Sequence, residues 1–328
     1  MSGPAGYRSP SCKQKEDGCM EYMDPTGKLR QTPYQVIGFA DYVKNRLAEL
    51  RSPIAPPPYA MPAEKEQLAA VSEYVSQNPY QFFETYNDHV NKTLTTGKTS
   101  MITRMSDPLL YTCMEDCCAA LGFGSLAGYT YEPEEAGLVY NAYATGHMDM
   151  TWVMVSNAYR KQNLLTDLEL TFLLGHELGH VAGLHTSARS ILKLKPESIR
   201  SQEHTADRAG LLATVWRIAR LEAGLSPTEM YHKALEAGKS LRHKQHILNN
   251  VASAGPWTRQ SLEEKLAEPK YAIPEKKAGR KDTHPSAWER IRALEEYVRL
   301  TEFAECIHTL WGSAHPAALR LGEEAAHV

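Results

Sequence analysis

Two histidines and a glutamate are spaced so that they could hold a metal ion and activate water. His176 and His180 lie four residues apart, so both imidazoles share one face of a helix and can bind the same ion. Glu177 follows the first histidine, and its carboxylate can lean over that ion and act on a bound water. This is the His-Glu-x-x-His arrangement of zinc hydrolases. The pattern predicts a catalytic zinc site, which needs a third protein ligand.

The third ligand has two candidates. His185 comes close to the pattern His-Glu-x-x-His-x-x-Gly-x-x-His, in which Gly183 is in register. That pattern needs its last histidine where Thr186 stands, and one residue turns a side chain by about 100° on a helix. Glu203 lies four residues before Asp207, so the two carboxylates share a face of a second helix. We favour Glu203 as the oxygen ligand, with Asp207 accepting a hydrogen bond from the free ring nitrogen of a ligand histidine.

Two helices are expected to carry these ligands. The capping box Thr166-Asp167-Leu168-Glu169 predicts the start of the motif helix, and Gly183 predicts its end. The second helix is expected to begin at Ser198 or Ser201 and to end at Gly224. Ala206 and Gly210 are small residues on its face, so the two helices can approach closely.

Short β-prone segments precede the motif helix, after a helix at about residues 107–121. They cover residues 127–132, 138–144 and 148–156, and the last alternates in side-chain type. Short strands followed by a metal-binding helix are the layout of a zincin-like domain. We therefore predict a mostly helical α+β fold with a small β-sheet. Either of the last two segments could offer an edge to an extended substrate, which would add as a strand.

With these motifs the chain resembles the gluzincin peptidases of the HtpX and CAAX-prenyl endopeptidase family. His176-Glu177-x-x-His180 and Glu203-x-x-Ala206-Asp207 match the family's two motifs in order. Further similar segments are residues 140–146, residues 225–227 and residues 283–294. The resemblance spans about residues 107–300 and implies peptide-bond hydrolysis. Unlike the best-known members, the chain has no predicted transmembrane helix.

Other site residues follow from these segments. Asn141, Ala142 and Tyr143 belong to the segment that could pair with an extended substrate. The resemblance implies that the loop of His284 lies near the metal. His284 could stabilise the oxyanion as a second electrophile, could occupy the open position of zinc in a resting state, or could simply pack before Pro285.

The predicted function is that of a zinc-dependent metalloendopeptidase with one zinc ion per chain, held by His176, His180 and Glu203. Glu177 is expected to take the proton of the zinc-bound water and to pass it to the leaving amine. The alternative is a non-catalytic, zinc-stabilised scaffold that binds peptides, which would not need Glu177. Activity is expected to fall below about pH 6, as protons compete for the histidine ligands.

Composition argues against several other classes of protein. The 328 residues are 42% hydrophobic and 23% charged with a net charge of −3, which is typical of a soluble globular protein and gives no basic excess for nucleic acid. No stretch approaches the roughly 18 consecutive apolar residues of a membrane-spanning helix, and the N-terminus lacks the apolar core of a signal peptide. We therefore expect a cytoplasmic protein without membrane insertion that acts on a protein or peptide substrate.

Three regions are expected along the chain. Residues 1–28 are polar and indicate a flexible tail. Residues 29–100 are expected to form a helical N-terminal region that recruits substrates or occludes the cleft as a pro-segment. Residues 101–328 are expected to form the metallopeptidase domain. Helical patterns in the N-terminal region cover residues 32–51, 63–77 and 79–93.

Overall fold

The computed structural model describes residues 55–78, 99–123, 126–132, 140–145, 152–250 and 257–312, together with three short strands between residues 13 and 32. The chain divides into two compact units, Met1–Ser52 and Pro53–Val328. The first unit holds an antiparallel sheet in the order β1-β2-β3, made of β1 (Lys13–Gln14), β2 (Met20–Met23) and β3 (Leu29–Thr32). Strands β1 and β2 lie within the residues expected to form a tail.

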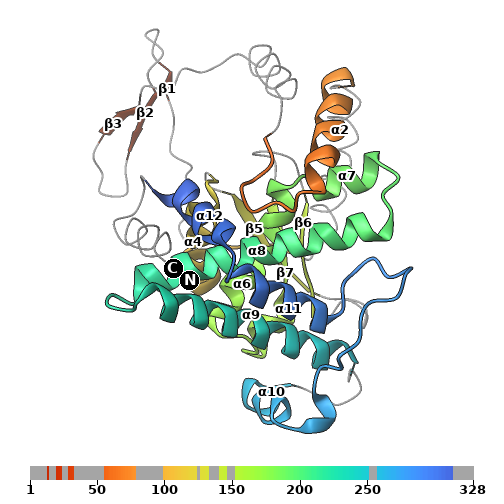
Figure 1. Cartoon of the computed structure of the whole chain (residues 1–328). Helices are drawn as coiled ribbons and strands as arrows, with labels where there is room; N and C mark the ends of the chain where they lie inside the picture. Colours follow the sequence, from red (N-terminus) through yellow and green to blue (C-terminus); the bar gives the residue numbers. More distant parts are fainter. Residues whose placement is uncertain are drawn as a thin grey trace, which may run out of the picture. The chain divides into compact units, whose positions relative to one another are not determined.

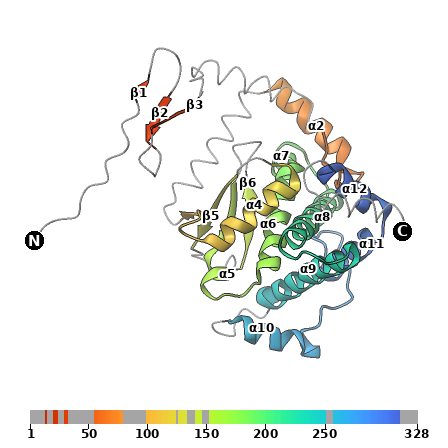
Figure 2. The same cartoon turned by 90° about the vertical axis from the view of Figure 1, so that its left-hand side faces the viewer.

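The second unit is a mostly helical α+β domain of the zincin type (Figure 1). Its described helices are α2 (Glu64–Gln77), α4 (Pro108–Leu121), α5 (Asn157–Lys161), α6 (Asp167–Ala182), α7 (His185–Ile191), α8 (Pro196–Leu221), α9 (Pro227–Asn250), α10 (Arg259–Leu266), α11 (Ala287–Tyr297) and α12 (Thr301–Trp311), with a 3₁₀ helix at Pro269–Tyr271. Figure 2 shows the sheet on the left of the second unit, α4 and α6 next to it, and α8, α9 and α11 on the right. The predicted fold class is confirmed.

A small mixed sheet lies beside the motif helix α6. Its described strands are β4 (Thr99–Met101), β5 (Ala127–Tyr131), β6 (Ala142–Thr145) and β7 (Trp152–Ser156), in the order β4-β5-β7-β6. β5 and β7 pair in parallel, and the other neighbours are antiparallel. β7 pairs on both sides, so the expectation that residues 148–156 offer a free edge is wrong. Among the described strands, β6 is an outer one.

The helices α6 and α8 pack with almost no side chain between them. A Cβ atom added at Gly175 would lie 2.7 Å from the Cβ of Ala213, and one at Gly179 would lie 2.8 Å from the Cα of Ala206. A Cβ at Gly210 would lie 2.7 Å from a backbone oxygen of α6. The close approach expected from Ala206 and Gly210 is therefore present, and two glycines of α6 share in it. It brings the ligand-bearing faces of both helices together.

The ends of these helices follow local signals. The hydroxyl of Thr166 accepts from the backbone N–H of Glu169, whose carboxylate accepts from the N–H of Thr166, so the predicted capping box is confirmed. Gly183 caps the C-terminal end of α6, as predicted. Helix α8 begins earlier than expected, with Pro196 at its first position, where a missing N–H has no cost. It ends at Leu221, about one turn before the expected stop.

Helix α2 belongs to the second unit. Its Leu68, Val71 and Val75 are buried, and the helix contacts α7 and α8. The division between the two units therefore lies N-terminal to the boundary expected near residue 100, while recruitment and occlusion stay predictions. Thr32 ends strand β3, and the rest of the helix expected at residues 32–51 lies outside the described residues, as does the helix expected at residues 79–93. No helix in the described part of the chain is long and apolar enough to cross a membrane.

Candidate metal centre

His176 and His180 from α6 and Glu203 from α8 converge on one point. Ligand atoms of the three side chains all lie within 4.8 Å of one another. The two Nε2 atoms are 3.2 Å apart, and each lies 3.6 Å from an oxygen of Glu203. The three side chains are at most 12% exposed. Two imidazole nitrogens and one carboxylate oxygen are a donor set that fits a divalent cation such as zinc.

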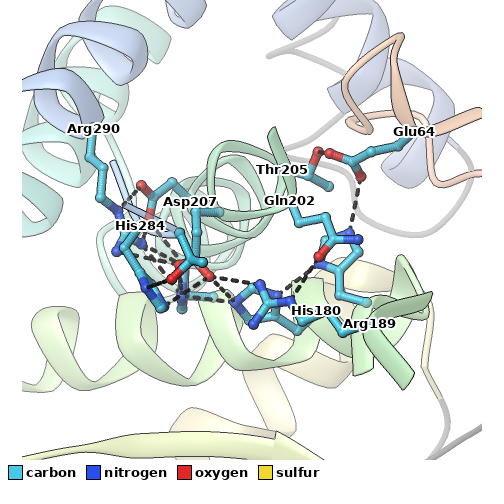
Figure 3. Close-up of polar contacts among 12 residues, drawn as sticks. Glu64, His180, Arg189, Gln202, Thr205, Asp207, His284 and Arg290 are labelled. Atoms are coloured by element: carbon cyan, nitrogen blue, oxygen red, sulfur yellow. Dashed lines mark hydrogen bonds and ion pairs between the residues drawn. The ribbon is translucent and has the colours of Figure 1, made fainter. Parts of the chain in front are cut away.

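Asp207 supports His176 and is itself held by two arginines. Its Oδ1 lies 3.0 Å from Nδ1 of His176. Arg242 from α9 and Arg290 from α11 both donate to its carboxylate, and Figure 3 shows Asp207 and Arg290 facing each other. Burial acts to raise the pKa of Asp207, but the two guanidinium groups outweigh burial and hold that pKa well below its usual range. A charged carboxylate at Nδ1 favours a proton there, which leaves Nε2 of His176 free to bind a metal.

Glu177 lies in a cavity of about 400 Å³ that the three candidate ligands also line. Burial, together with the nearby charge of Glu203, raises the pKa of Glu177 to about 8, although Arg242 and the backbone N–H of Ala144 on β6 oppose the rise. A carboxyl group with a pKa near neutral pH can both take up and release a proton there. The structure therefore places a buried carboxyl group beside the candidate metal ligands.

The other predicted site residues line the same cavity. Asn141, Ala142 and Tyr143 border it from β6 and the residue before that strand. His284 borders it as well, with Nε2 3.5 Å from Oε1 of Glu203 and its side chain 63% exposed. In Figure 3, His284 lies on the same side of the site as Asp207 and Arg290. The structure thus brings every predicted site residue except Asp207 to one cavity, and Asp207 contacts His176 from outside the cavity lining.

The sequence model of peptidase family M48 matches residues 106–298, which is more than half of the chain and includes both ligand-bearing helices. The chain belongs to peptidase family M48. It is therefore a metallopeptidase, a hydrolase that acts on peptide bonds in proteins or peptides, and the cluster of His176, His180 and Glu203 is its candidate metal site. No curated protein and no solved structure matches the chain.

His185 of this M48 peptidase lies behind the candidate ligands. Its Nδ1 is 2.8 Å from Nδ1 of His180, the nitrogen that points away from the other two ligands. On an unbroken helix, the side chain of His185 would point about 100° away from the position that the histidine pattern needs. Instead α6 ends at Ala182, and Leu184 takes a left-handed conformation with φ of 51° before α7 begins. This turn brings the ring of His185 back against His180.

Arg242 and Arg290 contact Asp207 and line the cavity, and the sequence analysis assigned neither of them to the site. Arg290 belongs to residues 283–294, a segment that resembles one of the family, but the resemblance gave it no role. Arg242 belongs to none of the motifs. A signal exists in the helical spacing, because Arg290 lies four and seven residues before the buried Leu294 and Tyr297. A charged residue in line with an apolar stripe must be buried with it and needs a partner. That partner is Asp207.

We expect this peptidase to keep its metal at a pH where exposed histidines would lose theirs. Burial, with the nearby charge of Arg242, lowers the pKa of His176 to about 4, and burial lowers that of His180 well below its ordinary value. Protons displace a metal only by binding the ligand nitrogens, and a lowered pKa means fewer bound protons at a given pH. The loss of metal is therefore expected at a lower pH than the value of about 6 expected from ordinary histidine pKa values. Metal analysis after dialysis at a series of pH values measures this, and loss already complete at about pH 6 would contradict it.

Proposed function

We propose that this M48 peptidase is a zinc-dependent endopeptidase in which His176, His180 and Glu203 hold one zinc ion. The observation that carries the proposal is the convergence of these three donors beside Glu177 in one cavity. Three protein ligands leave a position open, as in catalytic zinc sites, whereas structural sites use four. When bound there, zinc would act as a Lewis acid that lowers the pKa of water and polarises the scissile carbonyl.

Glu177 acts as the general base and then as the general acid. Its carboxylate takes a proton from the attacking water and passes the proton to the leaving amine. Its place in the cavity beside the three proposed zinc ligands supports both roles. Burial also keeps bulk water from competing for that proton.

Two cationic or polar groups can stabilise the oxyanion that forms on the carbonyl. Arg290 has Nη1 3.5 Å from Oε2 of Glu203, and it lines the cavity. His284 lines the cavity from a more exposed position. A donor held at the place where charge develops stabilises the transition state most. We assign this role to His284 together with Arg290.

Strand β6 offers a docking edge for the substrate. It is an outer strand among those described, and the backbone N–H of Ala144 already reaches Glu177. An extended peptide that adds to Asn141, Ala142 and Tyr143 would lie along the cavity with residues on both sides of the scissile bond. Docking of this kind favours cleavage within a chain, and hence an endopeptidase.

Removing the metal is expected to abolish peptide cleavage, and zinc is expected to restore it. The protein is incubated with a peptide library as purified, after treatment with a strong chelator, and after zinc is added back. Loss of Lewis-acid stabilisation worth several kcal/mol predicts a rate at least about 100-fold lower without metal. Equal cleavage with and without chelator would rule out the proposed mechanism. A fully zinc-loaded protein that cuts nothing would instead support the peptide-binding scaffold.

A further inference from the structure

A buried line of hydrogen-bonding groups runs from the candidate ligand His180 to helix α2. Nδ1 of His180 lies 2.8 Å from Nδ1 of His185, and Nε2 of His185 lies 3.0 Å from Oε2 of Glu64. Glu64 and His185 are each only 1% exposed. Glu64 lies outside residues 106–298, the part of the chain that the M48 family matches.

One assignment of protons gives each of these two contacts a donor and an acceptor. If Nε2 of His180 binds a metal, its Nδ1 must carry the ring proton and can donate it to Nδ1 of His185. His185 then carries its own proton on Nε2 and donates it to the carboxylate of Glu64. Glu64 is then the acceptor at the end of the line. The reverse direction would place a proton on the metal-facing nitrogen of His180.

The contacts of His180 with His185 and Glu64 resemble the contact of His176 with Asp207. Asp207 contacts Nδ1 of His176 directly, whereas Glu64 reaches His180 through one intervening ring. In Figure 3, Asp207 and Arg290 lie on one side of His180, and Glu64 and Thr205 lie on the other. Carboxylates that hold metal-binding histidines fix the orientation and the tautomer of the ring.

Two backbone features keep His185 in place. Leu184 adopts the left-handed conformation, which is rare for a residue with a side chain and returns the ring towards His180. Gly183 has an ordinary φ of −81°, yet a Cβ at this position would overlap the His185 ring. A side chain is therefore excluded at Gly183 by the ring and not by the backbone.

Glu64 is firmly held at the start of α2. Its Oε1 accepts hydrogen bonds from the hydroxyls of Thr205, at 2.7 Å, and Ser201, at 3.2 Å, both on α8. The backbone N–H of Met61 donates to Oγ1 of Thr205 at 2.9 Å. These contacts fix the carboxylate between α7 and α8, where it faces His185.

We propose that Glu64 is a positioning residue of the metal centre, which holds the ring of His180 through His185 and so makes helix α2 part of the site. The inference rests on the proposed function, because it takes His180 as a metal ligand. Helix α2 then contributes to metal affinity as well as to packing.

The test compares zinc affinities of the full-length protein and its variants by competition with a fluorescent chelator, well below the melting temperature of each metal-free protein. Glu64→Gln keeps the shape of the side chain and removes its charge, and is expected to weaken zinc binding about tenfold. Glu66→Gln is the matched control, since Glu66 is an exposed acid in the same first turn of α2. Its zinc affinity is expected to equal that of the wild type.

Gly183→Ala provides an independent variant, because it displaces the His185 ring and leaves Glu64 intact. It is expected to weaken zinc binding about 10- to 100-fold. Adding Glu64→Gln to a His185→Ala protein is expected to cause no further loss, since the link is already broken.

The outcomes separate this inference from the proposed function. If the wild type binds zinc no better than a protein with both His176→Ala and His180→Ala, the metal site itself is wrong. If the wild type binds zinc and Glu64→Gln binds it equally well, or if Glu66→Gln loses as much affinity, the role of Glu64 is wrong. Should Glu64→Gln not fold, Gly183→Ala decides, and wild-type affinity in that variant overturns the inference.

Discussion

Replacing Glu177 by glutamine is expected to lower kcat/KM by about 10²- to 10⁴-fold while zinc affinity stays close to that of the wild type. Glutamine fills the same space but accepts no proton at neutral pH, so the attacking water loses its base and the leaving amine loses its acid. Glu177 lies outside the ligand cluster, whose members are His176, His180 and Glu203. Steady-state rates on a library-derived peptide, with metal content measured on the same samples, check both halves of the expectation.

A stability measurement shows whether the Glu177→Gln protein is intact. Burial raises the pKa of Glu177 to about 8 in the folded metal-free protein, from an ordinary value of 4.5. Between these pH values the folded state holds a proton that the unfolded state has lost, so the free energy of unfolding falls as pH rises through this window and levels off above it. Glutamine removes this penalty. The metal-free variant should therefore be more stable than the wild type at about pH 8, by about 2–5 kcal/mol, and about equal to it at pH 4.5.

Two results would contradict the assigned role. Activity within tenfold of the wild type at equal zinc content would mean that another group transfers the proton. Loss of zinc together with activity would mean that Glu177 helps to hold the metal. A protein that is more stable, zinc-loaded and inactive is the combination that only a catalytic carboxyl group explains, because a structural residue would lose stability when replaced.

The sequence predicts those parts of the site that are encoded within single helices. The spacing of His176 and His180, the capping box at Thr166 and the spacing of Glu203 and Asp207 all depend on groups at most four residues apart. Helical geometry converts such spacings directly into shared faces. For the same reason the α+β class and the start of α6 could be predicted without knowledge of tertiary contacts.

Contacts between distant segments could not be predicted in the same way. Arg242 lies 35 residues from Asp207, Arg290 lies 83 residues from it, and Glu64 lies 121 residues from His185. No periodicity relates such positions, because their meeting depends on how the helices pack. The case of His185 has a different cause. Its side chain lies beyond the end of α6, where a left-handed residue replaces the regular rotation on which the prediction relied.

Replacing Asp207 by asparagine is expected to destabilise the metal-free protein by about 3–5 kcal/mol. The carboxylate accepts hydrogen bonds from Arg242 and Arg290 and contacts Nδ1 of His176, and it is only 1% exposed. Asparagine keeps the shape but removes the charge of the carboxylate to which both buried guanidinium groups donate. Removal of one partner from a buried ion pair costs far more than the pair itself contributes. Urea unfolding at neutral pH measures the loss, and Glu197→Gln, at an exposed acid of the same helix, is the control.

A second substitution separates the structural role of Asp207 from its role at the metal. Arg242→Met in the Asp207→Asn protein removes one of the uncompensated charges and should restore part of the lost stability, since an apolar side chain suits the buried position. Zinc affinity should stay about 10- to 100-fold below that of the wild type in both variants, because Nδ1 of His176 still lacks its carboxylate. If zinc affinity recovered together with stability, Asp207 would act on the metal only by keeping the protein folded. If neither variant differed from Glu197→Gln, the two arginines would find sufficient countercharge elsewhere, for example in Glu203, which lies 3.5 Å from Nη1 of Arg290.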